Sequence, residues 1–284
     1  MRRAERALPV RHALALGLLQ GPTELLPVSS SAHTALLPWL AGWDYEELDD
    51  ELRKGFEVAL HGGTAAALAL VAGRELAADA GRISRSRPLV LVLALLPPAL
   101  AGLALGPLIE RDLGGPVAIA LALAAGSAGM LAGERRGSAD VGGGESAAGD
   151  EAGRGLADAR PLDGLALGLA QAVALVPGVS RSGATISAAR WRGFARADAY
   201  RLSWTVALPV MAGAGLLQGL RVRRRGVPEG LRAGMAAGAV AAFFSTLAAG
   251  GLLRGRLQEI PLRPFALYRI ALAGLVVLRA GAGR

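Results

Sequence analysis

Cysteine is absent from this chain of 284 residues, and charged residues are scarce. The lack of cysteine excludes disulfide bonds and thiolate metal sites. Only 19% of the residues are Asp, Glu, Lys or Arg, against about 25% in soluble domains. Apolar residues make up 52% of the chain instead, and the mean hydropathy is +0.41. This composition indicates a membrane protein.

Apolar segments near the length of a membrane-spanning helix recur along the sequence. A helix of about 20 residues crosses a hydrocarbon core that is about 30 Å thick. Two further apolar segments, at about 7–40 and 161–190, are interrupted by Pro, Gly and Ser. We therefore predict an all-α integral membrane protein with two interrupted, re-entrant segments and about six spanning helices, at 55–73, 88–108, 114–133, 199–220, 231–253 and 264–281.

The basic balance of the chain does not indicate nucleic-acid binding. Lys and Arg number 31 against 23 Asp and Glu. The arginines gather between the apolar segments, as in RISRSR (82–87) and RVRRR (221–225), which is typical of the loops of membrane proteins. We expect the bilayer, and not a nucleic acid, as the partner of this chain.

An internal repeat divides the sequence into two halves. LGLLQGPTELLPVSSS (16–31) aligns without gaps on LGLAQAVALVPGVSRS (167–182), at a constant offset of 151 residues. Interrupted apolar segments at corresponding places in two halves are typical of a binding site built from broken helices. We predict a single membrane domain of two inverted repeats, about 1–136 and 156–284, joined by a flexible linker at 137–155.

The first interruption, PVSSSAH (27–33), reads as a proline-terminated turn that leads into a helix. Serines at a helix start cap its free N–H groups and help to bind an anion. Ser29 and Ser30 lie four and three residues before His33, so the three side chains share a helical face. Gln20 and Glu24 are spaced four residues apart on the preceding segment.

The second interruption, PGVSRSGAT (177–185), repeats this pattern with one change. It has Arg181 where the first copy has Ser30. An arginine inside an apolar segment is energetically costly and is a candidate functional residue. Since its planar guanidinium matches phosphate oxygens, the two interruptions together predict a site that handles phosphate.

These residues resemble the two signature motifs of the undecaprenyl-diphosphate phosphatase (bacitracin-resistance) family. The first motif, (E/Q)-x-x-x-E, matches QGPTE (20–24), and the second, P-G-x-S-R-S-x-x-T, matches residues 177–185. The likeness extends to 56–64, 197–214 and 265–278, so it covers nearly the whole chain. It implies a multi-pass hydrolase of the bacterial plasma membrane that converts undecaprenyl diphosphate into undecaprenyl phosphate. That product is the lipid carrier of peptidoglycan synthesis, and its recycling gives resistance to bacitracin.

The resemblance also implies roles for individual residues. It places the family's catalytic positions on Gln20, Glu24, Ser30, His33 and Arg181, together with a divalent cation, either Mg²⁺ or Ca²⁺. A neutral amide is neither a base nor a strong metal ligand, so the cation is assigned to Glu24 and not to Gln20. The substrate-binding positions are Gln20, Ser29, Ser31, Ser180, Ser182 and Thr185.

Two alternatives stay open at this stage. His33 is either the nucleophile, which we favour, or the base that activates Ser30 or a water molecule. The competing function is a flippase for a polyprenyl phosphate, because inverted repeats with broken helices are common in transporters.

The sequence leaves the oligomeric state open, and a homodimer is one possibility. His61 is read as a structural residue.

Overall fold

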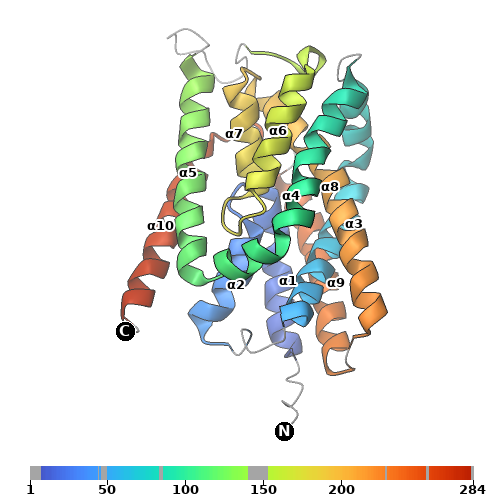
Figure 1. Ribbon diagram of the computed structural model, residues 1–284, viewed down its shortest axis with the longest axis vertical. Coiled ribbons are helices and arrows are strands. Elements are labelled where there is room, and N and C mark those ends of the chain that lie inside the picture. The colour runs from blue at the N-terminus through green and yellow to red at the C-terminus, as the bar shows by residue number, and fades with distance from the viewer. Residues whose placement is uncertain are drawn as a thin grey trace. The chain divides into compact units, whose positions relative to one another are not determined.

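The computed structural model describes residues 8–43, 45, 50–82, 86–139, 153–227, 229–253 and 256–282. Over these ranges every regular element is a helix (Figure 1). Most of the linker that the sequence predicts, residues 140–152, lies outside the described part of the chain. In chain order the elements are α1 (Val10–Leu25), α2 (Ser30–Ala41), α3 (Asp50–Arg82), α4 (Arg87–Leu113), α5 (Pro116–Ala139), η2 (Leu156–Asp158), α6 (Pro161–Val173), α7 (Arg181–Trp191), α8 (Arg196–Arg225), α9 (Glu229–Leu253) and α10 (Leu262–Ala282).

Within the described residues, four helices are long and apolar enough to cross a membrane: α4, α5, α9 and α10. They coincide with four of the six predicted spans, which confirms an all-α, multi-pass membrane protein. The other two predicted spans fall within α3 and α8, which have 33 and 30 residues and are long enough to cross at about 1.5 Å per residue. Both of these helices also carry charged residues, so six crossings stay a prediction.

The helices form two compact units, and each unit takes segments from both halves of the chain. Unit 1 comprises Met1–Leu25, His33–Gly73 and Met211–Leu253. Unit 2 comprises Leu26–Ala32, Arg74–Val210 and Arg254–Arg284. We describe each unit by itself. The organisation as one domain of two inverted repeats stays a prediction.

In unit 1, α1 packs along α9 through small residues. A Cβ atom at Gly17 would lie only 2.7 Å from the Cβ of Ala241, so the two backbones approach closely, as small residues allow in membrane helices. The hydroxyl of Ser245 donates a hydrogen bond of 2.9 Å to the carbonyl oxygen of Gly17. This packing fixes the helix that carries Gln20 and Glu24.

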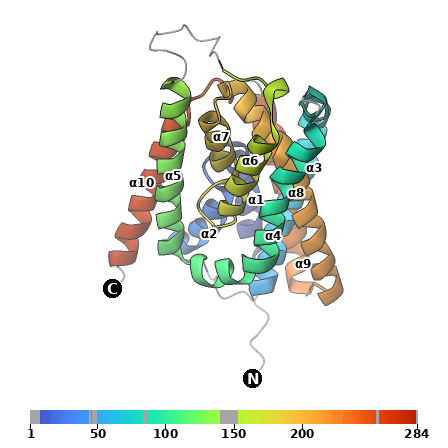
Figure 2. The ribbon, with the colours of Figure 1, turned by 45° about the horizontal axis from the view of Figure 1, so that its top comes forward.

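In unit 2, α5 and α10 lie side by side in both views (Figures 1 and 2), and α4 packs against α6. A Cβ atom at Gly164 would lie 2.8 Å from the Cα of Val90, so only glycine permits this approach of α6 to α4. The buried amide nitrogen of Gln171 donates to the carbonyl oxygen of Ala94 at 3.0 Å. Helix α4 therefore holds α6, which leads into the second interruption.

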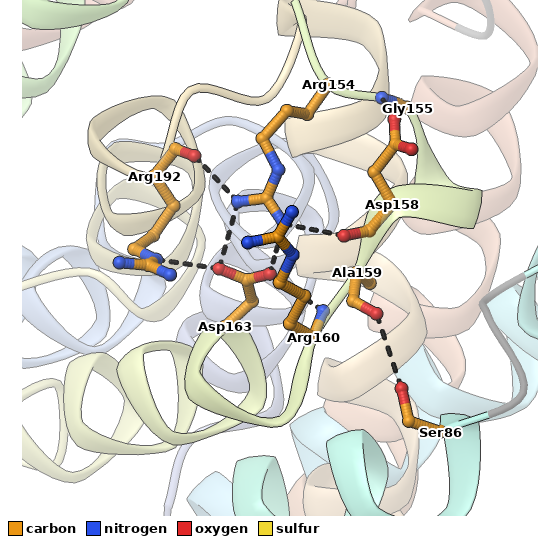
Figure 3. Close-up of polar contacts among 8 residues, drawn as sticks. All are labelled: Ser86, Arg154, Gly155, Asp158, Ala159, Arg160, Asp163 and Arg192. Atoms are coloured by element: carbon orange, nitrogen blue, oxygen red, sulfur yellow. Dashed lines mark hydrogen bonds and ion pairs between the residues drawn. The ribbon is translucent and has the colours of Figure 1, made fainter.

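The buried carboxylate of Asp163 connects the two outer ends of the second interrupted segment, the start of α6 and the end of α7 (Figure 3). Arg154 donates two hydrogen bonds to Asp163, of 3.1 and 2.6 Å, and Arg192 Nε donates a third, of 2.6 Å. The backbone N–H of Arg160 donates a fourth, of 2.8 Å. Asp163 lies in the first turn of α6, and Arg192 directly follows α7. The cluster therefore ties the start of α6 to the end of α7.

Replacing Asp163 with asparagine should destabilise the protein by about 3 kcal/mol, because two arginines would lose the charge that compensates them. This loss of stability is at the low end of the range expected for breaking a buried ion pair, since the side chains of Arg154 and Arg192 are 25% and 37% exposed. Thermal denaturation in detergent measures this change. Asp112→Asn is the control, because Asp112 and Arg111 form an exposed pair that water screens. Equal unfolding temperatures for the two variants would contradict the stabilising role of the cluster.

Candidate active site

The first interrupted segment breaks where the sequence predicts. Helix α1 ends at Leu25 and α2 begins at Ser30. Ser29 caps α2, since its hydroxyl oxygen accepts a hydrogen bond of 3.4 Å from the N–H of Ala32. The hydroxyls of Ser29 and Ser31 lie 3.2 Å apart. Two of the three consecutive serines therefore form a polar pair at the start of α2.

The second interrupted segment breaks in the same way. Helix α6 ends at Val173 and α7 begins at Arg181. Ser180 caps α7, with its hydroxyl oxygen accepting a hydrogen bond of 3.2 Å from the N–H of Gly183. The hydroxyls of Ser180 and Ser182 lie 3.4 Å apart. These contacts match those of the first break residue by residue.

The backbone conformation repeats as well. Ser29 has φ of 76° and Ser180 has φ of 72°, and they are the two non-glycine residues with positive φ in the described part of the chain. They also occupy equivalent positions of the 151-residue repeat. A left-handed conformation costs a residue with a side chain about 1–3 kcal/mol and is concentrated at functional sites. The fold retains this strain at both caps, which marks them as a candidate site.

One arginine of α10 brings the two breaks together within unit 2. The guanidinium of Arg269 donates hydrogen bonds to the carbonyl oxygens of Gly178 and Val179, at 2.8 and 2.9 Å. It also donates to the carbonyl oxygen of Pro27, at 3.4 Å. The two breaks therefore approach one another inside unit 2.

Within unit 1, Gln20 and Glu24 are paired on a buried face of α1. Gln20 Nε2 donates to Glu24 Oε2 at 3.4 Å, and the two residues are 0% and 7% exposed. Gln20 Oε1 is buried and has no hydrogen-bond partner among the described residues. His61 of α3 also reaches Glu24, with 3.6 Å between its Nε2 and Oε2. The amide nitrogen of Gln20 and an imidazole nitrogen of His61 therefore both lie close to Oε2 of the buried Glu24 carboxylate.

The predicted histidine lies in the first turn of the helix that follows the break. His33 is the fourth residue of α2, one turn after the cap Ser29, and only 8% of it is exposed. Ser30, the first residue of α2, is buried to the same extent. A buried imidazole one turn from a capped helix start can act as a nucleophile or as a base on a group held there.

Arg181 and Thr185 lie on the equivalent helix of the second break. The guanidinium carbon of Arg181 lies 5.6 Å from the ring centre of Trp204, within the range of a cation–π contact. The hydroxyl of Thr185 donates to the carbonyl oxygen of Arg181 at 2.8 Å and lies 2.6 Å from the hydroxyl of Ser203. An aromatic ring and a hydroxyl network from α8 therefore support the first turn of α7.

Two residues near these groups are not among the predicted site residues. His61, which the sequence suggests is structural, lies beside Glu24. Arg269 is an arginine in an apolar span, which is the same signal that selects Arg181. That rule, applied to FALYRIALAGLVVL (265–278), would have found Arg269.

Comparisons with known proteins identify the family of this chain. The family model described as bacitracin resistance protein BacA matches residues 13–275. A protein named undecaprenyl-diphosphatase from Geobacter sulfurreducens is 39% identical, with 95% of this chain and 98% of the relative covered. Relatives of the same name from Thermomicrobium roseum and Gemmatimonas aurantiaca are 39% and 36% identical, with 95% and 98% of this chain and 97% and 100% of the relatives covered. This chain therefore belongs to the bacitracin resistance protein BacA family.

Proposed function

We propose that this protein hydrolyses undecaprenyl diphosphate to undecaprenyl phosphate and inorganic phosphate in the bacterial membrane. The observation that carries the proposal is the pair of serine-capped helix starts at Ser29 and Ser180, which Arg269 joins within unit 2. Free N–H groups at a helix start attract an anion, and the helix dipole adds to that attraction. Two such starts suit the two phosphoryl groups of a diphosphate.

The second break supplies the positive charge for the transferred phosphoryl group. Arg181 is the first residue of α7, so its guanidinium extends from the turn whose N–H groups also bind the anion. Phosphoryl transfer needs little covalent chemistry from the protein and depends on positioning and on charge stabilisation. We assign the clamp to Arg181 and substrate binding to Ser29, Ser31, Ser180, Ser182 and Thr185.

The first break and α1 supply the reactive groups. His33 acts either as the nucleophile, the role we favour, or as the base that removes a proton from Ser30 or from water. Hydrolysis breaks the bond between the terminal phosphorus and the bridging oxygen, and that oxygen stays with undecaprenyl phosphate. Because the leaving group is itself a phosphate, it departs as an anion and places little demand on an acid.

A divalent cation fits the residues on α1. The carboxylate of Glu24 and the buried Oε1 of Gln20, which has no partner among the described residues, are hard oxygen ligands of the kind that Mg²⁺ and Ca²⁺ take. The described residues contain no cluster of three or more His, Asp or Glu that could hold a metal ion. We therefore assign the cation to Glu24, with the neutral Gln20 amide as a weaker oxygen ligand. When bound, it would neutralise phosphate charge.

The flippase alternative is less well supported. The relatives named above, which match this chain over nearly their whole length, are named for a phosphatase activity. A flippase would need the serines and Arg181 to bind phosphate, but it would give no role to the carboxylate of Glu24 or to the imidazole of His33. The homodimer stays a prediction.

Release of phosphate by the detergent-solubilised protein tests the proposed function. We expect inorganic phosphate from undecaprenyl diphosphate without any sealed bilayer, because hydrolysis needs only the site whereas transport needs two compartments. Chelation of divalent cations should stop the release, and added Mg²⁺ or Ca²⁺ should restore it. Pure protein that binds the lipid but releases no phosphate under these conditions would overturn the proposal in favour of transport.

A further inference from the structure

Arg269 is an unusual residue for the middle of an apolar helix. It is 0% exposed. Burying a charged side chain at such a place is energetically costly, so a residue that is kept there is a candidate functional residue. Among the described residues its hydrogen-bond partners are one hydroxyl and four backbone carbonyl oxygens. The hydroxyl belongs to Ser127 of α5, at 3.0 Å from Nε. None of these partners carries a negative charge that would neutralise the guanidinium.

The partners of Arg269 follow the internal repeat. Nη1 donates to the carbonyl oxygen of Pro27, and Nη2 donates to that of Gly178. Pro27 and Gly178 are equivalent residues at the 151-residue offset. The two ends of one planar group therefore bind the same backbone atom in the two copies of the break.

These carbonyls lie just before the two serine-capped helix starts. Each belongs to the residue two positions before a cap serine, Ser29 in the first copy and Ser180 in the second. A hydrogen bond to such a carbonyl fixes the peptide plane that leads into the strained cap, and so fixes the direction in which the helix start presents its N–H groups. One guanidinium sets this direction for both helix starts.

We propose that Arg269 is a positioning residue that holds the two serine-capped helix starts in register, so that both act on the same diphosphate. The uncompensated charge of its guanidinium also favours an anion at a distance. Lysine cannot replace it, because a single ammonium group lacks the planar fork that reaches two carbonyls in fixed directions. The proposal rests on the proposed function.

A double-mutant cycle measures whether the two helix starts act on the same anion, and it needs no catalysis. Inorganic pyrophosphate is titrated calorimetrically into the full-length protein in detergent, with Ser29→Ala, Ser180→Ala and both together. If the two serines act on one anion, their effects on the dissociation constant should be coupled, and the double variant should lose less than the product of the two single losses. In an Arg269→Lys background the losses should simply multiply.

The rate of hydrolysis provides the second measurement. Arg269→Lys should lower kcat by about 100-fold, the size of effect expected when a supporting change displaces a reacting group by about 1 Å. Gly126→Ala provides a variant that keeps the arginine. A Cβ atom there would overlap Arg269 Nη2 and lie 2.6 Å from the carbonyl oxygen of Val179, so it displaces the hydrogen bonds between Arg269 and the second break.

Gly129→Ala is the matched control. Gly129 also lies on α5, and a Cβ atom there would meet nothing within 4 Å. We expect Gly126→Ala to lower kcat severalfold and Gly129→Ala to leave it unchanged. If Arg269→Lys does not fold, this pair decides the matter.

The outcomes separate positioning from a purely structural role. Coupling that persists in Arg269→Lys, or a wild-type kcat in Gly126→Ala, would overturn the proposal and leave the proposed function intact. If the wild-type protein binds pyrophosphate but releases no phosphate from undecaprenyl diphosphate, the proposed function fails. The coupling cycle then still tests whether Arg269 makes the two helix starts act on one anion. Loss of coupling together with a lower kcat for Gly126→Ala than for Gly129→Ala supports the proposal.

Discussion

Replacing Arg181 with lysine should lower the rate of phosphate release by about 100-fold while the protein still folds and inserts into the membrane. The expected size is that of removing one preorganised donor from a charge that develops in the transition state. Lysine keeps the positive charge but loses the planar fork that binds two phosphate oxygens at once. The backbone of the first turn of α7 is unchanged, so the serine cap at Ser180 should persist. The measurement is kcat of the purified variant with undecaprenyl diphosphate.

Arg201→Lys is the matched control for this substitution. Arg201 is also half-buried in unit 2, and it has a carboxylate partner, Asp198, at 3.3 Å. It lies on α8, outside both breaks, so the same substitution there should leave kcat near its wild-type value. Near-normal hydrolysis by purified Arg181→Lys would show that Arg181 does not clamp the transferred phosphate.

The breaks were predictable because their causes are local. Proline ends a helix, serine caps the next one, and a repeat at a fixed offset shows that the same device occurs twice. The sequence therefore predicted a serine-capped helix start at each break, and the structure places the caps at Ser29 and Ser180. Four spans were predictable for the same reason, since apolar length is a property of one segment.

The support of the breaks was not predictable in this way. The partners of Arg269 are mainly backbone carbonyls, which every residue has, so no pattern of side chains shows which of them a distant arginine will reach. His61 was missed because its neighbour Glu24 lies on another helix, and only packing in unit 1 brings the two together. Helices α3 and α8 mix charged and apolar residues, so hydropathy alone does not show whether they cross the membrane.

Removing the imidazole of His33 should have the largest effect on hydrolysis. His33→Ala should lower kcat by at least about 100-fold, the lower range for a group that transfers a proton in the transition state, and by more if His33 is the nucleophile. His12→Ala is the control, because His12 also lies near the start of a helix but stacks on Trp43, with 3.9 Å between ring centres. Full activity of His33→Ala would exclude every catalytic role for this residue.

Rapid quenching of the wild-type protein with substrate labelled in its terminal phosphate separates the roles that remain. If a ring nitrogen of His33 attacks phosphorus, the P–O bond to undecaprenyl phosphate breaks, and the label stays on the protein as an acid-labile phosphohistidine until water removes it. If Ser30 attacks after losing its proton to His33, the label is an acid-stable phosphoserine. If His33 activates water, inorganic phosphate forms in one step and no protein is labelled. We expect the acid-labile label, since a buried imidazole in the first turn of α2 can attack a phosphoryl group directly, whereas the other routes need an additional proton transfer.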